Sequence, residues 1–415
     1  MPTEIDDWTN DIHTGDAVDT LAELPESSVH MVMTSPPYFG LRDYGVDGQI
    51  GLEDELDEYI EELVGVFREV RRVLRPDGSA WLNLGDSYAG SWGTQSKDET
   101  ENNLPQHATP NKNPARNSRL GRKNKMLVPH RVAIALQDDG WIVRNDVTWA
   151  KPNPMPSSVK DRLNTTTEQV FHLVPEPDYW YDLDAIREPY SEASKDRYES
   201  TFRDDLESQD TQTSPAVGAG NIDPNPAGKN PGDVFEVTTK PFPEAHFAVY
   251  PPELVEKPLK ATCPPTVCAK CGSPYEREVE EKPRELPDSG KVWDEVAGQY
   301  RTVESIKRNE DKNSGEGTKR NGTPKTAIGT KREFKGWTPT CDCDTDATEA
   351  GIALDPFAGA GTTALVAKRH GRRFIGVDLN EEYVAMAQKR LGLTVDNPEY
   401  VREDDVVGLE AFGDD

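Results

Sequence analysis

The segment from residue 352 to residue 391 constrains the fold of this 415-residue chain more than any other. Short apolar runs at 352–354 and 373–377 alternate with amphipathic stretches at 362–370 and 381–391, and Asn380 is placed to cap the last of these. Strands that alternate with helices form a parallel sheet with helices on both faces. We therefore predict an α/β fold with a mostly parallel, doubly wound sheet. Similar patterns predict further elements, strands at 29–34, 80–84, 143–149 and 168–174 and helices at 51–74 and 129–137.

A glycine-rich stretch, DPFAGAGTT, joins the first strand of this segment to its first helix. Gly359 and Gly361 permit a tight turn that a ligand can approach closely, and the helix that follows begins with free N–H groups. Asp378, 23 residues after Asp355, ends the next strand, where a carboxylate can bind ribose hydroxyls. The spacing matches neither the dinucleotide glycine motif nor a phosphate loop. An adenosine ligand without a pyrophosphate, such as S-adenosylmethionine (SAM), fits this pattern better than a turn without a ligand.

A second motif follows the apolar run VHMVMT, where Ser35, Pro36, Pro37 and Tyr38 come directly after a predicted buried strand. Proline fixes the backbone and cannot donate a hydrogen bond to a sheet. Taken alone, the motif indicates no more than a stiff turn.

Taken together, TSPPY and DPFAGAGTT resemble the catalytic and SAM motifs of the β-class DNA amino-methyltransferases, the N4-cytosine/N6-adenine family. Their order, with the catalytic motif first, is typical of the β class. HTGDAVDTL, LRPDGSAWLNLGD, GWIVRNDVTWAKPNPMPSSVKDR, GKNPGDVFEV and HFAVYPPEL also resemble family sequences. The resemblance implies a SAM-dependent, Rossmann-like methyltransferase fold that is circularly permuted and carries polar insertions. Within the family, the chain resembles stand-alone methylases of extreme halophiles, some of which act on CTAG.

The resemblance also implies the roles of individual residues. Ser35 and the Pro36 carbonyl would accept hydrogen bonds from the amino group of the target base, Pro37 would hold them rigid, and Tyr38 would stack on a flipped base. The implied SAM-binding residues are Asp16, Ala17, Asp355, Phe357, Ala358, Gly359, Gly361, Thr362, Thr363, Asp378 and Leu379, with Asp16 and Ala17 at the adenine.

The first residue of the catalytic motif favours one product. In this family serine there goes mostly with cytosine and aspartate mostly with adenine, so Ser35 predicts cytosine-N4 methylation. Adenine-N6 methylation stays the first alternative, and a non-catalytic, zinc-containing DNA-binding protein on a methylase fold is the second. Methylation of cytosine C5 is disfavoured because it needs a nucleophilic cysteine after a proline, and none of the five cysteines follows one.

A basic region lies between residues 111 and 162, where 11 basic residues face 4 acidic ones, a local balance of +7. Such a region in an acidic chain indicates a phosphate-binding surface for double-stranded DNA, and we assign DNA contacts to Lys151, Lys160 and Arg162. The domain prediction follows the motifs. It places the catalytic half at 1–190 with an insertion at 89–125, target recognition at 191–245, the SAM half at 246–276 and 336–415, and a polar insertion at 277–335.

Four cysteines flank that last insertion. Cys268 and Cys271 form a C-x-x-C pair, Cys341 and Cys343 form a C-x-C pair, and together they predict a structural Zn²⁺ site. Free thiols are the alternative.

The net charge of −28 fits either partial disorder or adaptation to very high salt, and ordered patterns over most of the chain favour the second. No signal peptide and no run of 18 apolar residues is present, so we expect a cytoplasmic protein that does not span a membrane. The sequence leaves open whether the chain is a monomer or a homodimer. It also leaves open whether a cognate restriction endonuclease exists.

Overall fold

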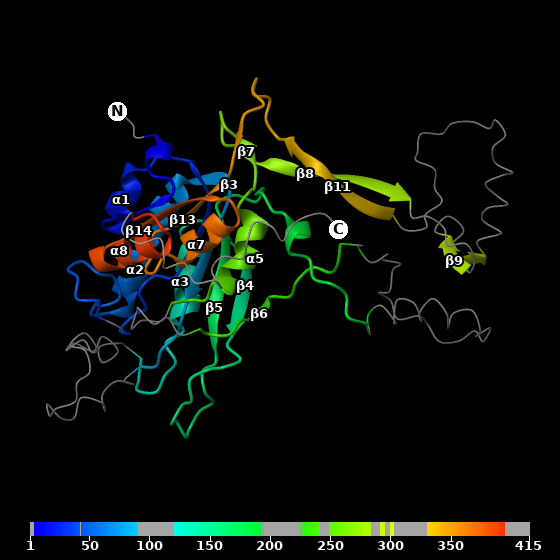
Figure 1. The fold of residues 1–415 in the computed structure, drawn as a ribbon. Coiled ribbons are helices and arrows are strands. Elements are labelled where there is room, and N and C mark those ends of the chain that lie inside the picture. The colour runs from blue at the N-terminus through cyan, green and yellow to red at the C-terminus, as the bar shows by residue number, and fades with distance from the viewer. Residues whose placement is uncertain are drawn as a thin grey trace, which may run out of the picture. The chain divides into compact units, whose positions relative to one another are not determined.

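The computed structural model describes residues 4–41, 43–89, 120–192, 194, 225, 227–240, 249–283, 291–294, 299–302 and 330–394. The chain divides into two compact units (Figure 1). The first comprises Met1–Asp182, Gly232–Tyr275 and Pro339–Asp415, and the second comprises Leu183–Pro231 and Glu276–Thr338. Each unit is described by itself.

The first unit is built on an eight-stranded sheet. Its strands are β1 (Asp11–Thr14), β2 (Val29–Thr34), β3 (Leu74–Leu84), β4 (Ile142–Ala150), β5 (Thr167–Val174), β6 (Val234–Glu236), β13 (Ile352–Asp355) and β14 (Arg373–Asp378). The order across the sheet is β1-β14-β13-β2-β3-β5-β4-β6. β5 runs antiparallel to both of its neighbours, and every other neighbouring pair is parallel. The prediction of a mostly parallel sheet is therefore confirmed.

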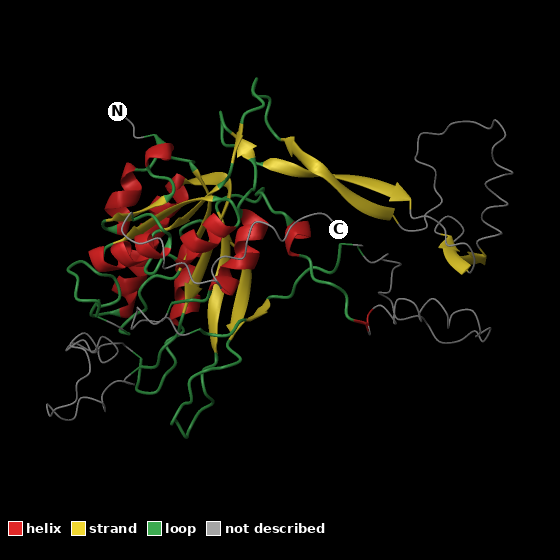
Figure 2. Cartoon of the chain, in the orientation of Figure 1, coloured by secondary structure: helices red, strands yellow, loops and turns green. Residues whose placement is uncertain are grey.

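Helices cover both faces of this sheet (Figure 2). One core contains buried side chains of α1 (Ala17–Glu23), α2 (Leu56–Val73) and α3 (Val128–Asp138), and the other contains those of α5 (Pro252–Thr262), α7 (Thr362–Arg369) and α8 (Glu381–Arg390). Successive strand residues point into opposite cores: Ile352 and Leu354 pack with the first set of helices, and Ala353 packs with the second. This two-sided burial explains why the strands have near-continuous apolar sequences.

The predicted elements of the first unit are all present, with shifted ends. α2 begins at Leu56 rather than at residue 51. At this start the Glu58 carboxylate accepts a hydrogen bond from the Glu55 N–H. β3 begins at Leu74, directly after α2, so Pro76 and Gly78 lie within a strand instead of following a helix. Several elements of this unit were not predicted. They are β1, α1, α5, the short 3₁₀ helix η1 (Ile5–Asp7) and the small ladder of β7 (Val267–Cys268) and β12 (Thr348–Glu349).

Within its described residues, the second unit contains two small ladders and the 3₁₀ helix η3 (Leu183–Ile186). β8 (Tyr275–Pro283) pairs with β11 (Thr330–Pro339), and β9 (Lys291–Asp294) pairs antiparallel with β10 (Gln299–Thr302). The Arg277 guanidinium lies 4.8 Å from the Phe334 ring centre and 5.0 Å from that of Trp337. The polar 277–335 insertion thus contains strands that the sequence analysis did not assign. The predicted insertion at 89–125 and the 191–245 region fall largely outside the described residues.

None of the helices in the described ranges has the length and apolar character needed to cross a membrane.

Candidate active site

The two sequence motifs, more than 300 residues apart in the chain, are adjacent in the sheet. β2 pairs in parallel with β13, with Val32 opposite Leu354. The buried Thr34 hydroxyl, just before Ser35, donates to Asp355 Oδ1 at 2.7 Å. From β13 the chain continues to β14 on one side, and from β2 it continues to β3 on the other. This reversal is a topological switch point, the usual ligand-binding position of an open α/β sheet.

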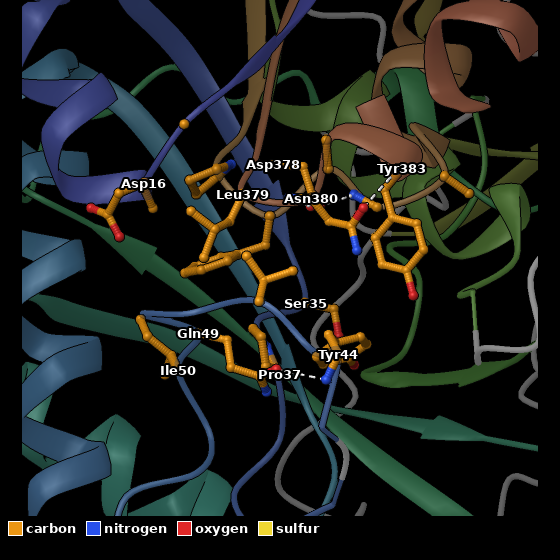
Figure 3. Close-up of a pocket in the computed structure, with 18 of the residues that line it drawn as sticks. Asp16, Ser35, Pro37, Tyr44, Gln49, Ile50, Asp378, Leu379, Asn380 and Tyr383 are labelled. Atoms are coloured by element: carbon orange, nitrogen blue, oxygen red, sulfur yellow. Dashed lines mark hydrogen bonds between the residues drawn. The ribbon is translucent and has the colours of Figure 1, made fainter. Parts of the chain in front are cut away.

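A pocket opens at this edge of the sheet (Figure 3). In the view, Asp16 and the Asp378–Asn380 turn lie on one side and Ser35 and Pro37 lie on the other. Eight of the predicted SAM residues line it: Asp16, Ala17, Phe357, Ala358, Gly359, Thr362, Asp378 and Leu379. Tyr44 and Tyr383 also line the pocket, with their rings edge to face at 6.2 Å between centres. The pocket therefore joins the catalytic motif to the glycine motif.

The glycine motif forms a turn that few other residues could adopt. Gly359 and Gly361 have φ values of 50° and 71°, in the left-handed region. A Cβ on Gly361 would lie 3.0 Å from the Cβ of Ala387 in α8, whereas a Cβ on Gly359 would meet no protein atom within 4 Å. Gly361 is therefore needed for close packing, and Gly359 leaves space in the pocket wall.

Two carboxylates lie on the wall beside this turn. Asp378 accepts hydrogen bonds from the N–H groups of Gly359 and Asn380, at 2.8 and 2.9 Å, while burial raises its pKa. Asp16 caps α1 by accepting from the backbone of its first turn. Gly15 donates to the Asp378 carbonyl at 3.0 Å, which holds the two carboxylate-bearing loops together. Each carboxylate is thus oriented by backbone N–H groups.

Asp355 was predicted to contact the cofactor, but it is 1% exposed and does not line the pocket. Its carboxylate accepts from Thr34, from the Phe357 N–H and from the Tyr250 hydroxyl, the last at 2.8 Å. Burial raises its pKa to about 6. Thr363, also buried and absent from the lining, donates to the Met33 carbonyl and lies 2.6 Å from the Tyr250 hydroxyl. Asp355 and Thr363 thus join β2 to the glycine motif beneath the pocket. Gly361, which was also predicted to bind the cofactor, does not line the pocket either.

The catalytic motif is held by a hydrogen-bond network on the opposite wall. Ser35 Oγ donates to the Tyr38 hydroxyl at 3.3 Å, and that hydroxyl donates to Glu168 Oε2 at 2.8 Å. Asn83 Nδ2 reaches all three oxygens, at 2.9 to 3.2 Å. Lys151 forms an ion pair with Glu168. Burial and the Glu168 charge raise the pKa of Tyr38 well above its usual value, so the phenol stays protonated.

Only part of the catalytic motif reaches the pocket. Ser35 and Pro37 line it, and Pro36 and Tyr38 do not. The Tyr38 ring packs against Gly85, where a Cβ would lie 2.5 Å from a ring carbon. Its hydroxyl is engaged by Glu168 and Asn83. The predicted stacking of Tyr38 on a flipped base stays a prediction.

Sequence reasoning missed Asn83, Glu168 and Tyr250. Asn83 could have been found, because a polar residue interrupts an otherwise apolar strand end in WLNLGD. Glu168 begins a strand at the same edge of the sheet, which only the strand order reveals. Tyr250 lies in HFAVYPPEL, which resembles family sequences, but that resemblance assigned no role to the tyrosine.

The comparison with protein families decides the identity of the chain. A family model described as DNA methylase, the N6/N4 methyltransferase model, matches residues 29–325 and 345–389. The chain is an N6/N4 DNA methylase. It is 35% identical over 410 residues to the type II methyltransferase M.SfiI of Streptomyces fimbriatus, which covers 90% of this chain and 89% of the relative.

Two further type II methyltransferases align over similar lengths. M.XycI of Xanthomonas campestris pv. cyanopsidis is 32% identical over 385 residues, covering 91% of this chain and 86% of its own. M.Cfr9I of Citrobacter freundii is 31% identical over 398 residues, covering 94% and 89%. Membership of the N4-cytosine/N6-adenine DNA methylase family is thereby confirmed, and the methylase is an enzyme that modifies DNA. Its assignment to the β class stays a prediction.

The three residues assigned to DNA contact differ in their surroundings. In this methylase Lys151 faces inward, paired with Glu168 and lying 4.4 Å from the Trp149 ring centre. The Arg162 guanidinium lies 4.0 Å from the Tyr88 ring centre. Lys160 is exposed. Lys160 thus presents a free approach to phosphate, and Lys151 is placed to act within the site.

The four cysteines of the predicted metal site converge in the first unit. The sulfur atoms of Cys268, Cys271, Cys341 and Cys343 all lie within 4.8 Å of one another. Cys268 is buried at the end of β7, and Cys271 is exposed on the turn that follows. Four thiol ligands at this separation match the tetrahedral donor set of a structural zinc site. Cys263 is buried apart from this group, and burial raises the pKa of its thiol to about 12.

Proposed function

We propose that this methylase transfers a methyl group from SAM to the exocyclic N4 amino group of a cytosine in double-stranded DNA. The observation that carries the proposal is the environment of Ser35. Ser35 lines the pocket, and its hydroxyl donates to Tyr38. One lone pair of this oxygen accepts from Asn83 Nδ2 at 3.2 Å, and the second is left to accept a hydrogen bond from an amino group that enters the pocket.

An accepting oxygen is what the reaction requires. The lone pair of a cytosine amino group is delocalised into the ring, which makes the nitrogen a poor nucleophile. The resemblance assigns the two N–H groups of this nitrogen to Ser35 Oγ and to the carbonyl of Pro36, which does not line the pocket itself but lies between the lining residues Ser35 and Pro37. Hydrogen bonds to both acceptors would draw the nitrogen toward tetrahedral geometry. Because Pro36 and Pro37 fix the backbone, both acceptors are in place before the base arrives.

The pocket residues fit SAM as the methyl donor. Asp378 is placed to accept from ribose hydroxyls, and Asp16 and Ala17 line the same wall. A Cβ at Gly359 would project into space that no protein atom fills, which is the space a ligand needs. When bound there, SAM supplies an electrophilic methyl group on a sulfonium centre.

The network behind Ser35 also provides a direction for the proton that the amino nitrogen must lose. The chain of donors runs from Ser35 to Tyr38 and on to the Glu168 carboxylate. Glu168 is the one anionic end of this chain and is balanced by Lys151. A proton accepted by Ser35 Oγ can thus move toward Glu168 without leaving the protein.

Ser35 as the first residue of the motif favours cytosine over adenine. The relatives' designation as type II methyltransferases favours a sequence-specific enzyme of the restriction–modification kind. CTAG as the target and an origin in an extreme halophile remain predictions from the sequence resemblance.

We also infer a structural Zn²⁺ on Cys268, Cys271, Cys341 and Cys343. The support is the convergence of four sulfur atoms from two segments that lie 70 residues apart, from Cys271 to Cys341. The metal would tie these segments together next to β13. Methyl transfer by direct displacement does not require it.

One experiment tests the methyl-transfer proposal. The full-length protein is incubated in high salt with methyl-labelled SAM and unmethylated genomic DNA, and the modified nucleoside and its sequence context are then identified. We expect label in N4-methylcytosine at a single sequence. Label confined to N6-methyladenine would overturn the choice of base, and DNA without label would overturn the enzymatic proposal.

A Ser35→Ala variant is the matched test of the mechanism. It should lose transfer by at least about a hundredfold, because one of the two amino-group acceptors is gone. SAM affinity should change little, since Ser35 is assigned to the base. A large loss of SAM affinity with retained turnover would mean that Ser35 serves the cofactor instead.

A further inference from the structure

The loop between β4 and β5, residues 151–166, exposes three apolar side chains, and two of them are almost entirely in water. Met155 is 87% exposed and Leu163 is 90% exposed. Apolar side chains left almost fully in water on a well-formed segment mark a surface that another molecule covers. Lys160 and Arg162 of this loop are predicted to contact DNA, but Met155 and Leu163 have no role in that prediction.

The loop is held in place at its base and along its length. The Lys151 N–H donates to the Thr166 carbonyl at 2.9 Å, which closes the base. The Asn164 side chain donates to the Met155 carbonyl at 3.1 Å, which ties together the two limbs that carry the apolar residues. Asn153 exchanges hydrogen bonds with the Thr239 backbone, both at 2.9 Å.

Charged contacts and three prolines hold it further. Asp161 forms an ion pair with Lys123, and the Arg162 guanidinium stacks on Tyr88. Pro152, Pro154 and Pro156 restrict the first limb. A loop restrained at so many points still leaves Met155 and Leu163 exposed, so the exposure does not come from a loose segment.

The loop leaves the sheet at the same edge as the catalytic motif. β5 begins beside the end of β3, with Gln169 opposite Leu84, and β3 in turn pairs with the end of β2. Figure 1 shows the loop extending beyond the ends of β4 and β5. Lys151, its first residue, pairs with Glu168, which accepts the Tyr38 hydroxyl. The apolar pair is therefore connected to the site that must receive the base.

We propose that Met155 and Leu163 enter the DNA duplex beside the target base and fill the space that the base leaves when it rotates into the pocket. This inference rests on the proposed function. The loop has a net charge of +2, whereas the whole chain has a net charge of −28. Its charged residues are Lys151, Lys160, Arg162 and Asp161, and a positive loop matches a partner lined with phosphates. Apolar side chains inserted between base steps are a known way to stabilise unstacked DNA.

The experiment compares full-length wild type with the Met155→Ala/Leu163→Ala double variant on two substrates. One is the paired duplex carrying the site identified for the wild type. The other is the same duplex with a mismatch at the target base, which costs less to unpair. Ile134→Ala is the control, because Ile134 is 57% exposed on α3, outside the loop.

We expect the double variant to bind the paired duplex within about twofold of the wild type but to methylate it about tenfold more slowly in a single turnover. The mismatch should restore most of that rate. With pyrrolo-cytosine, a fluorescent cytosine analogue that pairs with guanine, at the target position, the fluorescence that reports unstacking should fall in parallel on the paired duplex. Ile134→Ala should behave as wild type on both substrates.

Three outcomes overturn the inference. An equal loss of rate on paired and mismatched duplexes means that the two side chains do not act on base extrusion. Unchanged rates on both substrates mean that they do not touch the DNA. Unchanged rates with an altered oligomeric state mean that the apolar pair contacts protein. A wild type that fails to methylate either substrate instead contradicts the proposed function, which separates the two failures.

Discussion

At the scale of single residues, the site depends on one carboxylate that does not reach the pocket. Glu168 receives hydrogen bonds from Tyr38 and Asn83 and an ion pair from Lys151. All of these partners are donors, so an ionised carboxylate satisfies them and a neutral amide cannot. Because Tyr38 in turn accepts from Ser35, the orientation of the Ser35 hydroxyl depends on the charge of Glu168.

The Glu168→Gln variant tests this dependence. The glutamine amide must present an N–H to one of the three donors, which should misorient Tyr38 and with it Ser35. We expect the turnover number to fall by about tenfold or more, with the KM for SAM nearly unchanged. Single-turnover and steady-state assays give the two values. A rise in the KM for SAM at constant turnover would contradict the positioning role.

Asp355 gives a residue-scale prediction about stability. Its pKa is raised from the usual 3.8 to about 6 because the carboxyl is buried, so the folded protein holds this proton more tightly than the unfolded chain. The resulting stabilisation is fully present below the unfolded pKa and is lost as the pH rises through about 6. The Asp355→Asn variant lacks this titration.

The stability of Asp355→Asn relative to wild type should therefore rise by about 2 kcal/mol between about pH 4 and about pH 7. Chemical denaturation at constant high salt measures the free energy of unfolding. The exposed Asp54, as Asp54→Asn, is the control and should show no such trend. A difference between Asp355→Asn and wild type that is flat across this range would contradict the buried-carboxyl interpretation.

At the scale of elements, the sequence predicted the helices and strands whose own residues carry a clear hydrophobic pattern. β2, β13, β14, α7 and α8 were found within one or two residues because each has a continuous apolar run or a helical stripe and a clear stop. The short β1 was not found, since Ile12 is the one apolar residue in its sequence DIHT, whereas β13 has a continuous apolar run. α5 was not found because Pro258 lies inside it. The antiparallel insertion of β5, which brings Glu168 to Tyr38, depends on long-range pairing that no local pattern contains.

The cysteine cluster gives the prediction at this scale. Two short segments, around β7 and around Cys341, have little apolar core of their own, and a shared metal would hold them in register. We expect about one Zn²⁺ per chain in protein purified without chelator. Cys341→Ser and Cys343→Ser should lower the zinc content to a small fraction, as measured by mass spectrometry of the metal. Cys263→Ala, outside the cluster, should retain zinc, and equal zinc in all variants would contradict the site.

At the scale of the whole molecule, the chain carries far more acidic than basic groups, 75 against 47. On α2 this excess sets like charges four residues apart, Asp57 with Glu61 and Glu58 with Glu62, all on the exposed face. Like charges at this spacing repel and destabilise a helix, and salt screens the repulsion. The same screening weakens each phosphate contact, so DNA binding in high salt must depend more on apolar contacts such as those proposed for the β4–β5 loop.

The melting temperature should therefore rise by several degrees as KCl is raised from about 0.2 M to about 2 M, where the Debye length falls below roughly 3 Å. A Glu61→Gln/Glu62→Gln variant removes one charge from each pair without touching the core, and it keeps Asp57 and Glu58 in the first turn, where acidic side chains favour the helix dipole. It should melt at a higher temperature than wild type in low salt and at the same temperature in high salt, as followed by circular dichroism. A constant gap between the two proteins at every salt concentration would show that the substitutions act on helix propensity rather than on repulsion, and that the acidic surface is not what makes this methylase depend on salt.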